Sequence, residues 1–210
     1  MIKRIVVSAI FMVSAACAFA DWSRIISAGI SVPFQNTTFD WEEDYGTEHE
    51  TGYGIGLDGQ FRTVKDNGLS LMCDIDAGYA NIGDIEGARS GVFIGAGYNF
   101  SKNESYKIIF SGVAGAEQIT LSDSDSFVWN GHDIDDDTDF TDLIIGADLY
   151  LSKQVSDSFG FFAQCTVGLG IGVAEKKFSF EKGDSTFSRS FEGTGDIFIV
   201  KPKAGVCWTF

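Results

Sequence analysis

Apolar and polar residues alternate along most of this chain, and the alternation is clearest near its end. From Phe198 to Phe210 every even-numbered position is apolar, whereas the odd-numbered positions include Lys201 and Lys203. A period of two predicts a β-strand whose two faces differ. The same pattern recurs upstream and predicts eight strands, at about 22–34, 51–62, 69–80, 91–100, 106–121, 140–151, from about 158 onward, and at 196–210.

The predicted connections alternate between long and short. The long ones are 35–50, 81–90 and 122–139, and the short ones are 63–68, 101–105 and 152–157. Asn67-Gly68 in the first short connection is a strong signal for a tight β-hairpin turn. A final hairpin around residues 182–185 is expected to extend the last two strands. Long loops at one end and short turns at the other are typical of membrane β-barrels.

The aromatic residues favour such a barrel over a soluble eight-stranded sandwich or lipocalin-like barrel, in which the apolar face would point inward. They gather at both ends of the strands with aliphatic residues between them, as a bilayer selects. They are Trp22, Phe61, Tyr98, Phe100, Tyr106, Phe159, Trp208 and Phe210 at one end, and Phe34, Tyr53 and Tyr79 at the other. For residues 21–210 we predict one all-β domain, an eight-stranded antiparallel up-and-down transmembrane β-barrel with long extracellular loops and short periplasmic turns.

Residues 1–20 have the composition of a secretory signal peptide. Lys3 and Arg4 precede an apolar run, and Ala18-Phe19-Ala20 fits the small-x-small pattern for cleavage after Ala20. The apolar run is too short to span a bilayer as a helix. The alternative is cleavage before Cys17 followed by lipidation. In either case the sequence predicts an exported chain.

Composition narrows the set of partners and cofactors. The chain has 30 acidic and 15 basic residues, a net charge of −15, and the loss of Lys3 and Arg4 with the leader would make it −17. This balance argues against nucleic-acid binding, which needs basic surfaces. Cys73, Cys165 and Cys207 are widely spaced and form no disulfide framework or metal motif. We therefore expect these three cysteines to be small, buried hydrophobic residues. No cofactor is predicted.

The polar faces of the predicted strands carry charges that would enter the lumen. They are Asp58, Arg62, Asp74, Asp76, Lys107, Glu117, Asp142, Asp148, Lys201 and Lys203. An eight-stranded barrel is just wide enough inside for side chains, and unpaired charges there would be very unfavourable. We therefore predict a salt-bridged plug in which Lys201 and Lys203 reach across the lumen to Asp58, Asp74, Asp76 or Asp148. The alternative is a narrow polar pore or a path for protons or ions.

The first and third long loops are strongly acidic. Asp133, Asp135 and Asp137 occupy alternate positions, as the first ligands of a calcium loop do, and form a candidate weak divalent-cation site. Thr138 and Ile144 replace the glycine and the bidentate glutamate of such a loop, so a solvated acidic surface is favoured. His49 and His132 lie in the same loops. An Asp/His-activated water is conceivable there, but we predict no catalytic residues and no enzyme.

Aromatic residues are interspersed among these loop acids. They are Phe39, Trp41, Tyr45, Phe127 and Trp129. The sequence favours packing within the loops or contact with a partner as their role.

The signal peptide, the alternating connections and the terminal Trp208-Thr209-Phe210 resemble those of small eight-stranded outer-membrane β-barrel proteins, such as the outer-membrane protein W and X-like groups. The resemblance covers residues 21–210 as architecture, and no motif selects a subfamily. It implies a bacterial outer-membrane location and an assembly signal, Trp208 and Phe210, for the barrel-assembly machinery. Family members variously serve as structural proteins, adhesins, surface targets or conduits for small apolar molecules.

We therefore expect a monomeric, surface-exposed, non-enzymatic barrel in outer-membrane lipid, with a structural or interaction role. Its acidic loops would meet an extracellular ligand or a divalent cation. One alternative is a narrow porin-like transporter of small solutes or apolar molecules. Another is a soluble or lipid-anchored, calycin-like periplasmic binder.

Overall fold

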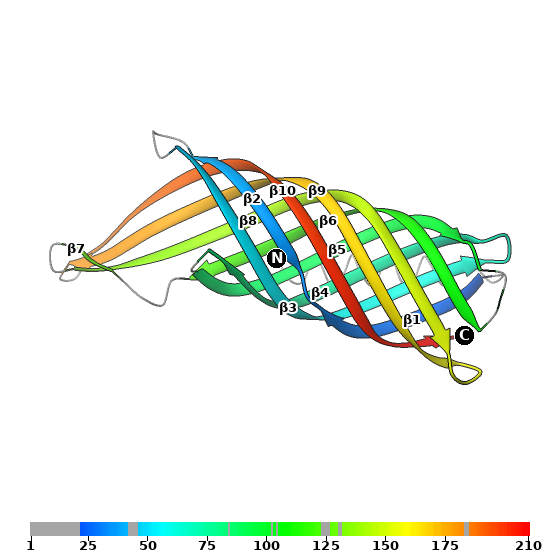
Figure 1. The fold of residues 1–210 in the computed structure, drawn as a ribbon. Coiled ribbons are helices and arrows are strands. Elements are labelled where there is room, and N and C mark those ends of the chain that lie inside the picture. The colour runs from blue at the N-terminus through cyan, green and yellow to red at the C-terminus, as the bar shows by residue number, and fades with distance from the viewer. Residues whose placement is uncertain are drawn as a thin grey trace.

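The computed structural model describes residues 22–41, 46–83, 85–101, 103, 105–122, 127–129, 132–182 and 185–210. They form strands β1 (Trp22–Ser31), β2 (Phe34–Trp41), β3 (Gly46–Lys65), β4 (Leu69–Ile82), β5 (Ile85–Asn99), β6 (Tyr106–Ser122), β7 (Phe127–Trp129), β8 (His132–Gln154), β9 (Phe159–Lys182) and β10 (Ser185–Thr209) (Figure 1). In this part of the chain no helix is long and apolar enough to cross a bilayer. The predicted leader, 1–20, lies outside the described residues.

The strands close into one antiparallel barrel (Figure 1). β1 and β2 follow one another at the same position in the ring, because each pairs with β10 on one side and with β3 on the other. From β3 the ring continues through β4, β5, β6, β8 and β9 to β10. The short β7 pairs with the beginning of β8. The predicted eight-stranded up-and-down barrel is therefore confirmed.

The first strand position is interrupted at Val32 and Pro33. Pairing with β10 stops after Ser31 and resumes at Phe34. Within the gap the Val32 N–H donates to the Pro202 carbonyl at 2.9 Å. In an antiparallel ladder the N–H and C=O of one residue point to the same neighbour, so the missing N–H of Pro202 faces this break. Pro202 is thus tolerated inside β10 because the ladder is already irregular on that side.

Most residues predicted as long loops belong to strands, so the predicted loop lengths are wrong. β2 continues to Trp41 and β3 begins at Gly46, while β4 continues to Ile82 and β5 begins at Ile85. In the third connection β8 begins at His132. The backbone ladder continues in these extensions although the apolar alternation does not, because their outer faces carry polar residues.

Polar cross-strand pairs hold the β2–β3 extension together. The Trp41 indole N–H donates to Glu48 at 2.9 Å, and the Thr47 hydroxyl donates to Asp40 at 2.6 Å. Such pairs stabilise the hairpin where its outer face is no longer apolar. A search for alternating hydrophobicity therefore misses these parts of the strands.

The two ends of the barrel differ. Short connections join β3 to β4, β5 to β6 and β8 to β9 at one end of the barrel, which we call the turn end. Gly68 there has a φ of 93°, and the Asn67 side chain accepts a hydrogen bond from the Leu69 N–H at 3.1 Å, so the predicted tight turn forms. At the opposite, extended end, β8, β9 and β10 project beyond the other strands (Figure 1).

The barrel is apolar outside and polar inside. Leu57, Ile145 and Leu169 are 74%, 70% and 63% exposed on the outer wall, whereas Arg62 and Asp148 in the lumen are 0% exposed. This distribution is the one that a bilayer requires, and it is opposite to that of the soluble, calycin-like alternative.

Aromatic side chains form a girdle at each end of the apolar wall. Phe34 and Tyr53 are directly paired neighbours toward the extended end, and both are exposed. At the turn end, Phe159 packs edge-on against Trp208 with ring centroids 5.8 Å apart. Exposed aromatic residues at the turn end also include Tyr98, Phe100, Tyr106, Phe161 and Phe210. Two such girdles are typical of barrels embedded in lipid.

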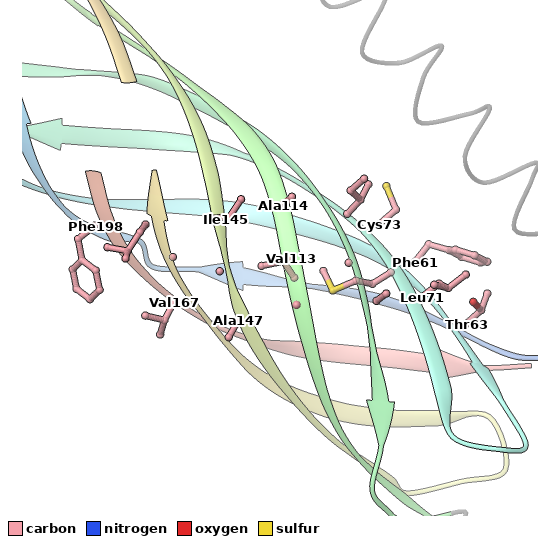
Figure 2. A pocket seen from close by; sticks show the side chains of 18 residues that line it. Phe61, Thr63, Leu71, Cys73, Val113, Ala114, Ile145, Ala147, Val167 and Phe198 are labelled. Atoms are coloured by element: carbon pink, nitrogen blue, oxygen red, sulfur yellow. The ribbon is translucent and has the colours of Figure 1, made fainter. Parts of the chain in front are cut away.

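Small residues make the middle of the outer wall shallow. Ala96, Gly112 and Ala147 are paired neighbours on β5, β6 and β8, and a Cβ added at Gly112 would meet open space. They line an apolar hollow with larger side chains such as Leu71 and Phe198 (Figure 2). None of its described lining residues is charged, so it is a surface for apolar contact rather than for chemistry.

An arginine placed in the middle of the outer wall should destabilise the barrel. Ile94 is 49% exposed there, and we expect Ile94→Arg to lower the free energy of unfolding in lipid vesicles by about 2–4 kcal/mol. The matched control is Phe100→Arg at the turn end, where the expected loss is about 0–1 kcal/mol. Equal losses at the two positions would contradict a bilayer around this wall.

Candidate functional site: a charged layer in the lumen

The inward-facing residues of the barrel form apolar and charged layers. On β6 every second residue points inward, and the series along the axis reads Lys107, Ile109, Ser111, Val113, Gly115, Glu117, Ile119 and Leu121. On β8 the corresponding series reads Ser152, Tyr150, Asp148, Gly146, Ile144, Asp142, Phe140 and Thr138. In both series the buried carboxylates Glu117, Asp148 and Asp142 lie between apolar residues, whereas Lys107 lies at the turn end of its series.

A buried apolar cluster closes the lumen toward the turn end. Tyr150 stacks on Phe162 with ring centroids 5.6 Å apart, and its hydroxyl lies 3.2 Å from the hydroxyl of Ser27. The complete cluster is Ile25, Val64, Ile109, Tyr150, Phe162 and Cys207. All six are buried, so this layer separates the charged residues from water at the turn end.

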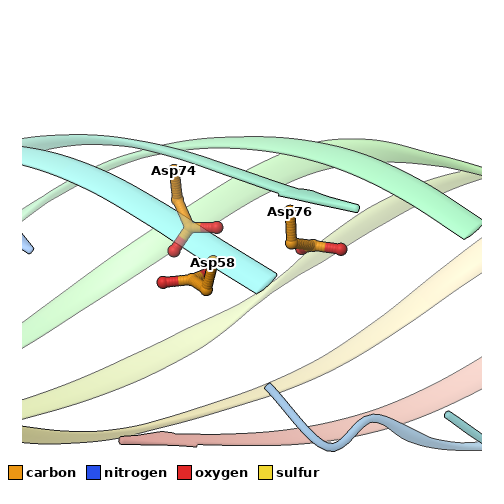
Figure 3. A group of neighbouring side chains, drawn as sticks. All are labelled: Asp58, Asp74 and Asp76. Atoms are coloured by element: carbon orange, nitrogen blue, oxygen red, sulfur yellow. The ribbon is translucent and has the colours of Figure 1, made fainter. Parts of the chain in front are cut away.

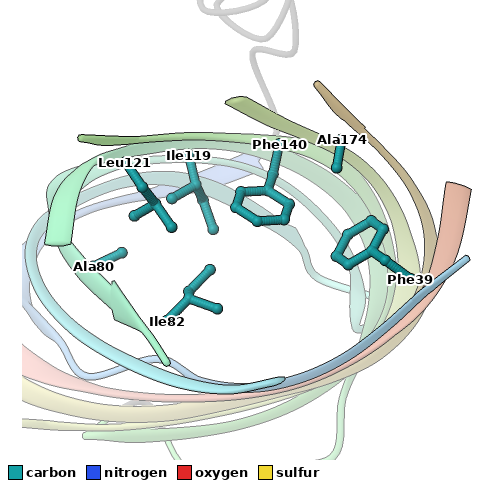
Figure 4. Close-up of a cluster of buried hydrophobic side chains, with 7 residues drawn as sticks. All are labelled: Phe39, Ala80, Ile82, Ile119, Leu121, Phe140 and Ala174. Carbon is teal, nitrogen blue, oxygen red and sulfur yellow. The ribbon is translucent and has the colours of Figure 1, made fainter. Parts of the chain in front are cut away.

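A second apolar cluster closes the lumen toward the extended end (Figure 4). Its members are Phe39, Ala80, Ile82, Ile119, Leu121, Phe140 and Ala174. The rings of Phe39 and Phe140 meet across the lumen with centroids 5.1 Å apart. Phe39 is predicted above as a loop aromatic, and the structure places it inside the barrel because β2 extends past Phe34.

Between these clusters, Lys203 on β10 bridges two carboxylates that enter the lumen from β3 and β4. Its ammonium lies 2.5 Å from Asp58 Oδ2 and also bonds Asp74 Oδ2. Figure 3 shows the carboxyl groups of Asp58 and Asp74 next to each other, as this shared contact requires. Gln60 donates to Asp74 at 3.2 Å and to Gln164 at 3.1 Å, which links this group to β9.

Arg62 fills the part of the lumen beside this group. Its guanidinium donates to Asp148 at 2.9 Å and to the Ser111 hydroxyl at 3.1 Å. Its Cζ also lies 4.6 Å from the ring centroid of Tyr150. Asp148 accepts further hydrogen bonds from Gln164 at 2.7 Å and Thr166 at 2.9 Å. The planar guanidinium thus joins β3 to β6 and β8, a task that suits Arg better than Lys.

Lys201 and Arg89 form a second group nearer the extended end. The Lys201 ammonium lies 2.6 Å from Asp76 and 3.3 Å from Glu117, and 4.2 Å from the ring centroid of Phe93. Arg89 forms a two-pronged pair with Glu117 and lies 3.3 Å from Asp76. The two cations and two carboxylates alternate in space, which allows each charge to be paired.

The structure brings together all the predicted lumenal charges except Lys107. That residue is half-buried beyond the apolar cluster of the turn end, beside Lys65 and Asp157, and it forms no ion pair with a described residue. Asp142 does enter the lumen and is 1% exposed, but no described side chain forms an ion pair with it.

Arg89 is the residue of the network that the sequence interpretation missed. It falls in the predicted loop 81–90, which the structure shows to be strand. The sequence did contain the information needed to find it. In this strand the odd-numbered residues, such as Gly91 and Gly95, face inward, and Arg89 is also odd-numbered. Extending the alternation two residues upstream would have placed its side chain in the lumen.

The candidate cation site in the third loop does not have the shape of a calcium loop. Asp133, Asp135 and Asp137 belong to β8. The backbone of Asp133 pairs with Val128 of β7, and that of Asp135 and Asp137 pairs with β9. An extended backbone rises about 3.3 Å per residue, so it spreads these positions instead of folding them around one ion. The Asp137 carboxylate accepts a hydrogen bond from Ser122 at 2.7 Å, and the side chains of the other two lie outside the described part of the chain.

The two histidines are on different strands. The ring of His49, in β3, makes a 2.9 Å hydrogen bond with the Thr38 hydroxyl on the neighbouring strand β2. His132 begins β8, and its side chain lies outside the described part of the chain.

The other aromatic residues predicted in the loops have different positions. Trp41 points inward, and Tyr45 lies outside the described residues. Phe127 and Trp129 belong to β7, of which the structure describes the backbone.

Three lumenal carboxylates are close enough together to suggest a metal site. Asp58, Asp74 and Asp76 each offer an oxygen within 4.8 Å of the others (Figure 3). Lys203 bridges the first two and Lys201 bonds the third, so the positive charge that a metal would supply comes from the chain itself. The donor set therefore fits tethered ammonium groups better than a metal ion.

The predicted assembly signal lies at the turn end of β10. Trp208 and Phe210 point outward and are 36% and 69% exposed. The Phe210 N–H donates to the carbonyl of Arg24 at 2.9 Å, so the last residue still pairs with the first strand.

Comparison with known proteins identifies the fold. Neither the family models nor the curated protein sequences match this chain. Among solved structures, the outer membrane protein OprG from Pseudomonas aeruginosa is 11% identical, with 90% of this chain and 95% of that chain covered and a TM-score of 0.55. Ail of Yersinia pestis is 14% identical, with 88% and 98% covered and a TM-score of 0.43. The likeness to OprG shows that this chain has the β-barrel fold of an outer-membrane protein.

Removing the ammonium of Lys203 should destabilise the barrel strongly. In Lys203→Met the neighbouring carboxylates Asp58 and Asp74 lose their shared cation. We expect the free energy of unfolding, measured with urea in lipid vesicles, to fall by about 3–5 kcal/mol. The control Lys65→Met removes an exposed lysine at the turn end and should change it by less than about 0.5 kcal/mol. Equal effects would show that Lys203 is not paired in the lumen.

Proposed function

We propose that this protein is a bacterial outer-membrane barrel with a sealed lumen, a non-enzymatic protein whose structural or interaction role resides at its extended end. The apolar outer wall, the two aromatic girdles and the charged interior support a position in a bilayer. The predicted signal peptide supports export. The fold shared with OprG supports the outer membrane as the destination.

The observation that carries this proposal is the filling of the lumen. Arg62 and Asp148 are 0% exposed and Lys201 is 1% exposed, although all three are charged and lie in the lumen of the barrel. Apolar clusters lie on both sides of them. A transporter of small solutes needs a continuous polar path, so this interior favours a sealed barrel over the narrow porin-like alternative.

The extended end is the part that would meet a partner. Its exposed acidic residues among those described are Asp40, Glu86, Asp137, Asp139, Glu175, Glu192 and Asp196. They outnumber the exposed basic residues described there, Lys177 and Arg189. A surface of this sign suits a cationic extracellular ligand or a divalent cation.

The exposed aromatic residues Trp208 and Phe210 would serve as the signal for the barrel-assembly machinery. They lie at the turn end. If the extended end faces the outside of the cell, the turn end faces the periplasm. The pairing of β1 with β10 closes the ring within one chain, so the proposed state in the membrane is a monomer.

A sealed lumen predicts the absence of ion conduction. Purified protein inserted into planar bilayers should give no current steps above those of the bare membrane, because buried salt bridges and apolar layers block the axis. A general porin reconstituted in the same way serves as the positive control. Discrete steps from this protein would instead support the transporter.

The orientation predicts which end reacts with reagents outside the cell. In a background with Cys73, Cys165 and Cys207 replaced by Ala, Ser188→Cys at the extended end should be labelled by a membrane-impermeant maleimide on intact cells. Asp157→Cys at the turn end should be labelled after permeabilisation. Both positions are exposed in the structure. The reverse pattern would invert the proposed topology.

A further inference from the structure

The buried charges in the lumen do not balance. The buried acidic residues are Asp58, Asp74, Asp76, Glu117, Asp142 and Asp148, and the buried basic residues are Arg62, Arg89, Lys201 and Lys203. The described interior therefore carries six carboxyl groups and four cations, an excess of two negative charges if every group is ionised.

The surroundings make such an excess very unfavourable. Apolar clusters separate the charged layer from both ends of the lumen, and the apolar outer wall surrounds it. A charge that is removed from water and left without a counter-charge is unstable by many kcal/mol, so it takes up a proton or another cation. The excess must therefore be neutralised by something that the chain does not supply.

One excess carboxyl group lies in the pair Asp58 and Asp74. A single ammonium, that of Lys203, bonds Oδ2 of both residues, and Oδ1 of each is buried without a hydrogen-bond partner among the described residues. Gln60 on β3, Gln164 on β9 and Ser31 on β1 lie around the pair and are uncharged. The nearest other charged groups are Asp76 on β4 and Arg89 on β5, and Arg89 is already paired with Glu117 and Asp76. Two adjacent carboxylates and one cation leave one negative charge over.

The other excess carboxyl group is Asp142. It lies directly opposite Glu117 on β6, and its Oδ1 is buried without a described partner. Arg89 on β5 and Lys201 on β10 are both engaged by Glu117 and Asp76.

The remaining strands around Asp142 offer it no charge. Its neighbour on β9 is Gly172, and the side chains beside that glycine are Ile197 of β10 and Phe39 of β2. No described cation is left to neutralise Asp142.

We propose that the lumen holds two exchangeable protons, one shared within the Asp58–Asp74 pair and one on Asp142. Each step is the association of one carboxylate with one proton, so no oxidant, reductant or metal takes part. The two protons balance the four cations of the lumen against six carboxyl groups. The inference goes beyond the proposed function, because it holds for the closed interior whether or not the extended end binds a partner.

A proton fits these places better than a metal ion does. A Cβ at Gly172 would lie 2.5 Å from Asp142 Oδ1, so there is little free space beside that oxygen. At the other place the ammonium of Lys203 already occupies the position between the two carboxylates. A metal ion needs several oxygen ligands at about 2.0–2.6 Å, whereas a proton needs one oxygen.

The proposal gives the pH dependence a definite sign. In the unfolded chain carboxyl groups ionise near pH 4, so above about pH 6 the folded state would bind up to two more protons than the unfolded state, until it releases them at alkaline pH. Stability then falls as the pH rises. The ratio of folded to unfolded protein should drop about tenfold per pH unit for each extra proton, hence about a hundredfold for two.

The test compares three isosteric variants with the wild type in lipid vesicles, with EDTA present. Asp142→Asn removes one excess carboxyl group, so it should reduce the slope from about a hundredfold to about tenfold per pH unit and stabilise the barrel at pH 9. Asp58→Asn should do the same at the other place. The control Asp148→Asn removes a carboxylate that pairs with Arg62, so it should destabilise the barrel without reducing the slope.

Infrared difference spectroscopy on the wild type reads the protons directly and does not depend on how the variants fold. Titration from neutral to alkaline pH should remove the C=O stretching band of protonated buried carboxyl groups. Asp142→Asn should lower the amplitude of that band by about half. A flat stability profile from pH 6 to 9 without this band would overturn the proposal. A loss of stability caused by EDTA at neutral pH would also overturn it, in favour of a bound metal ion.

Discussion

The pairing of charges across a narrow lumen is the constraint on which the rest of this structure depends. A sheet in a bilayer must close, because lipid offers no hydrogen bonds to its edges. Closure with eight strands leaves an interior that is just wide enough for side chains. The charged residues on the inner face then have no access to bulk water, so Lys201 and Lys203 must find carboxylates on other strands across the lumen, as they do.

The apolar clusters at the two ends of the lumen make this pairing effective. By excluding water they lower the local dielectric constant, which strengthens each ion pair and makes each unpaired charge more unfavourable. The same clusters seal the axis of the barrel. One arrangement of side chains thus gives both the stability of the interior and the closed lumen on which the proposed function rests, and it leaves the extended end free to interact.

Much of the fold follows from the sequence because lipid imposes the alternation. Where the outer face must be apolar, as from Leu143 to Leu151, a period of two marks the strand and the direction of each side chain. Beyond the bilayer the ladder of β2 and β3 continues through polar pairs such as Thr47 and Asp40, and the hydrophobic pattern no longer reports it. Because the strands continue where the hydrophobic alternation ends, the alternation alone misses Arg89 and predicts loops that are too long.

The pairing within the lumen could be predicted only in part. Parity places Asp58, Asp74 and Lys203 inside, but which residues meet depends on the register of every strand between them and on the tilt that closes the ring. Lys107 has the right parity and lies too near the turn end to join. Asp142 also has the right parity, yet its lack of a partner becomes visible when the neighbouring Glu117 is found to be engaged by Arg89 and Lys201.

A double-mutant cycle between Lys201 and Asp76 tests the central claim most directly. The two residues are far apart in the sequence and meet through the lumen at 2.6 Å. The cycle compares the free energies of unfolding in lipid vesicles of Lys201→Met, Asp76→Asn and the double variant. The structure predicts that the double variant loses less stability than the sum of the single losses, with a coupling energy of about 1–3 kcal/mol. Additive losses would contradict an interior held together by charge pairs that cross the lumen.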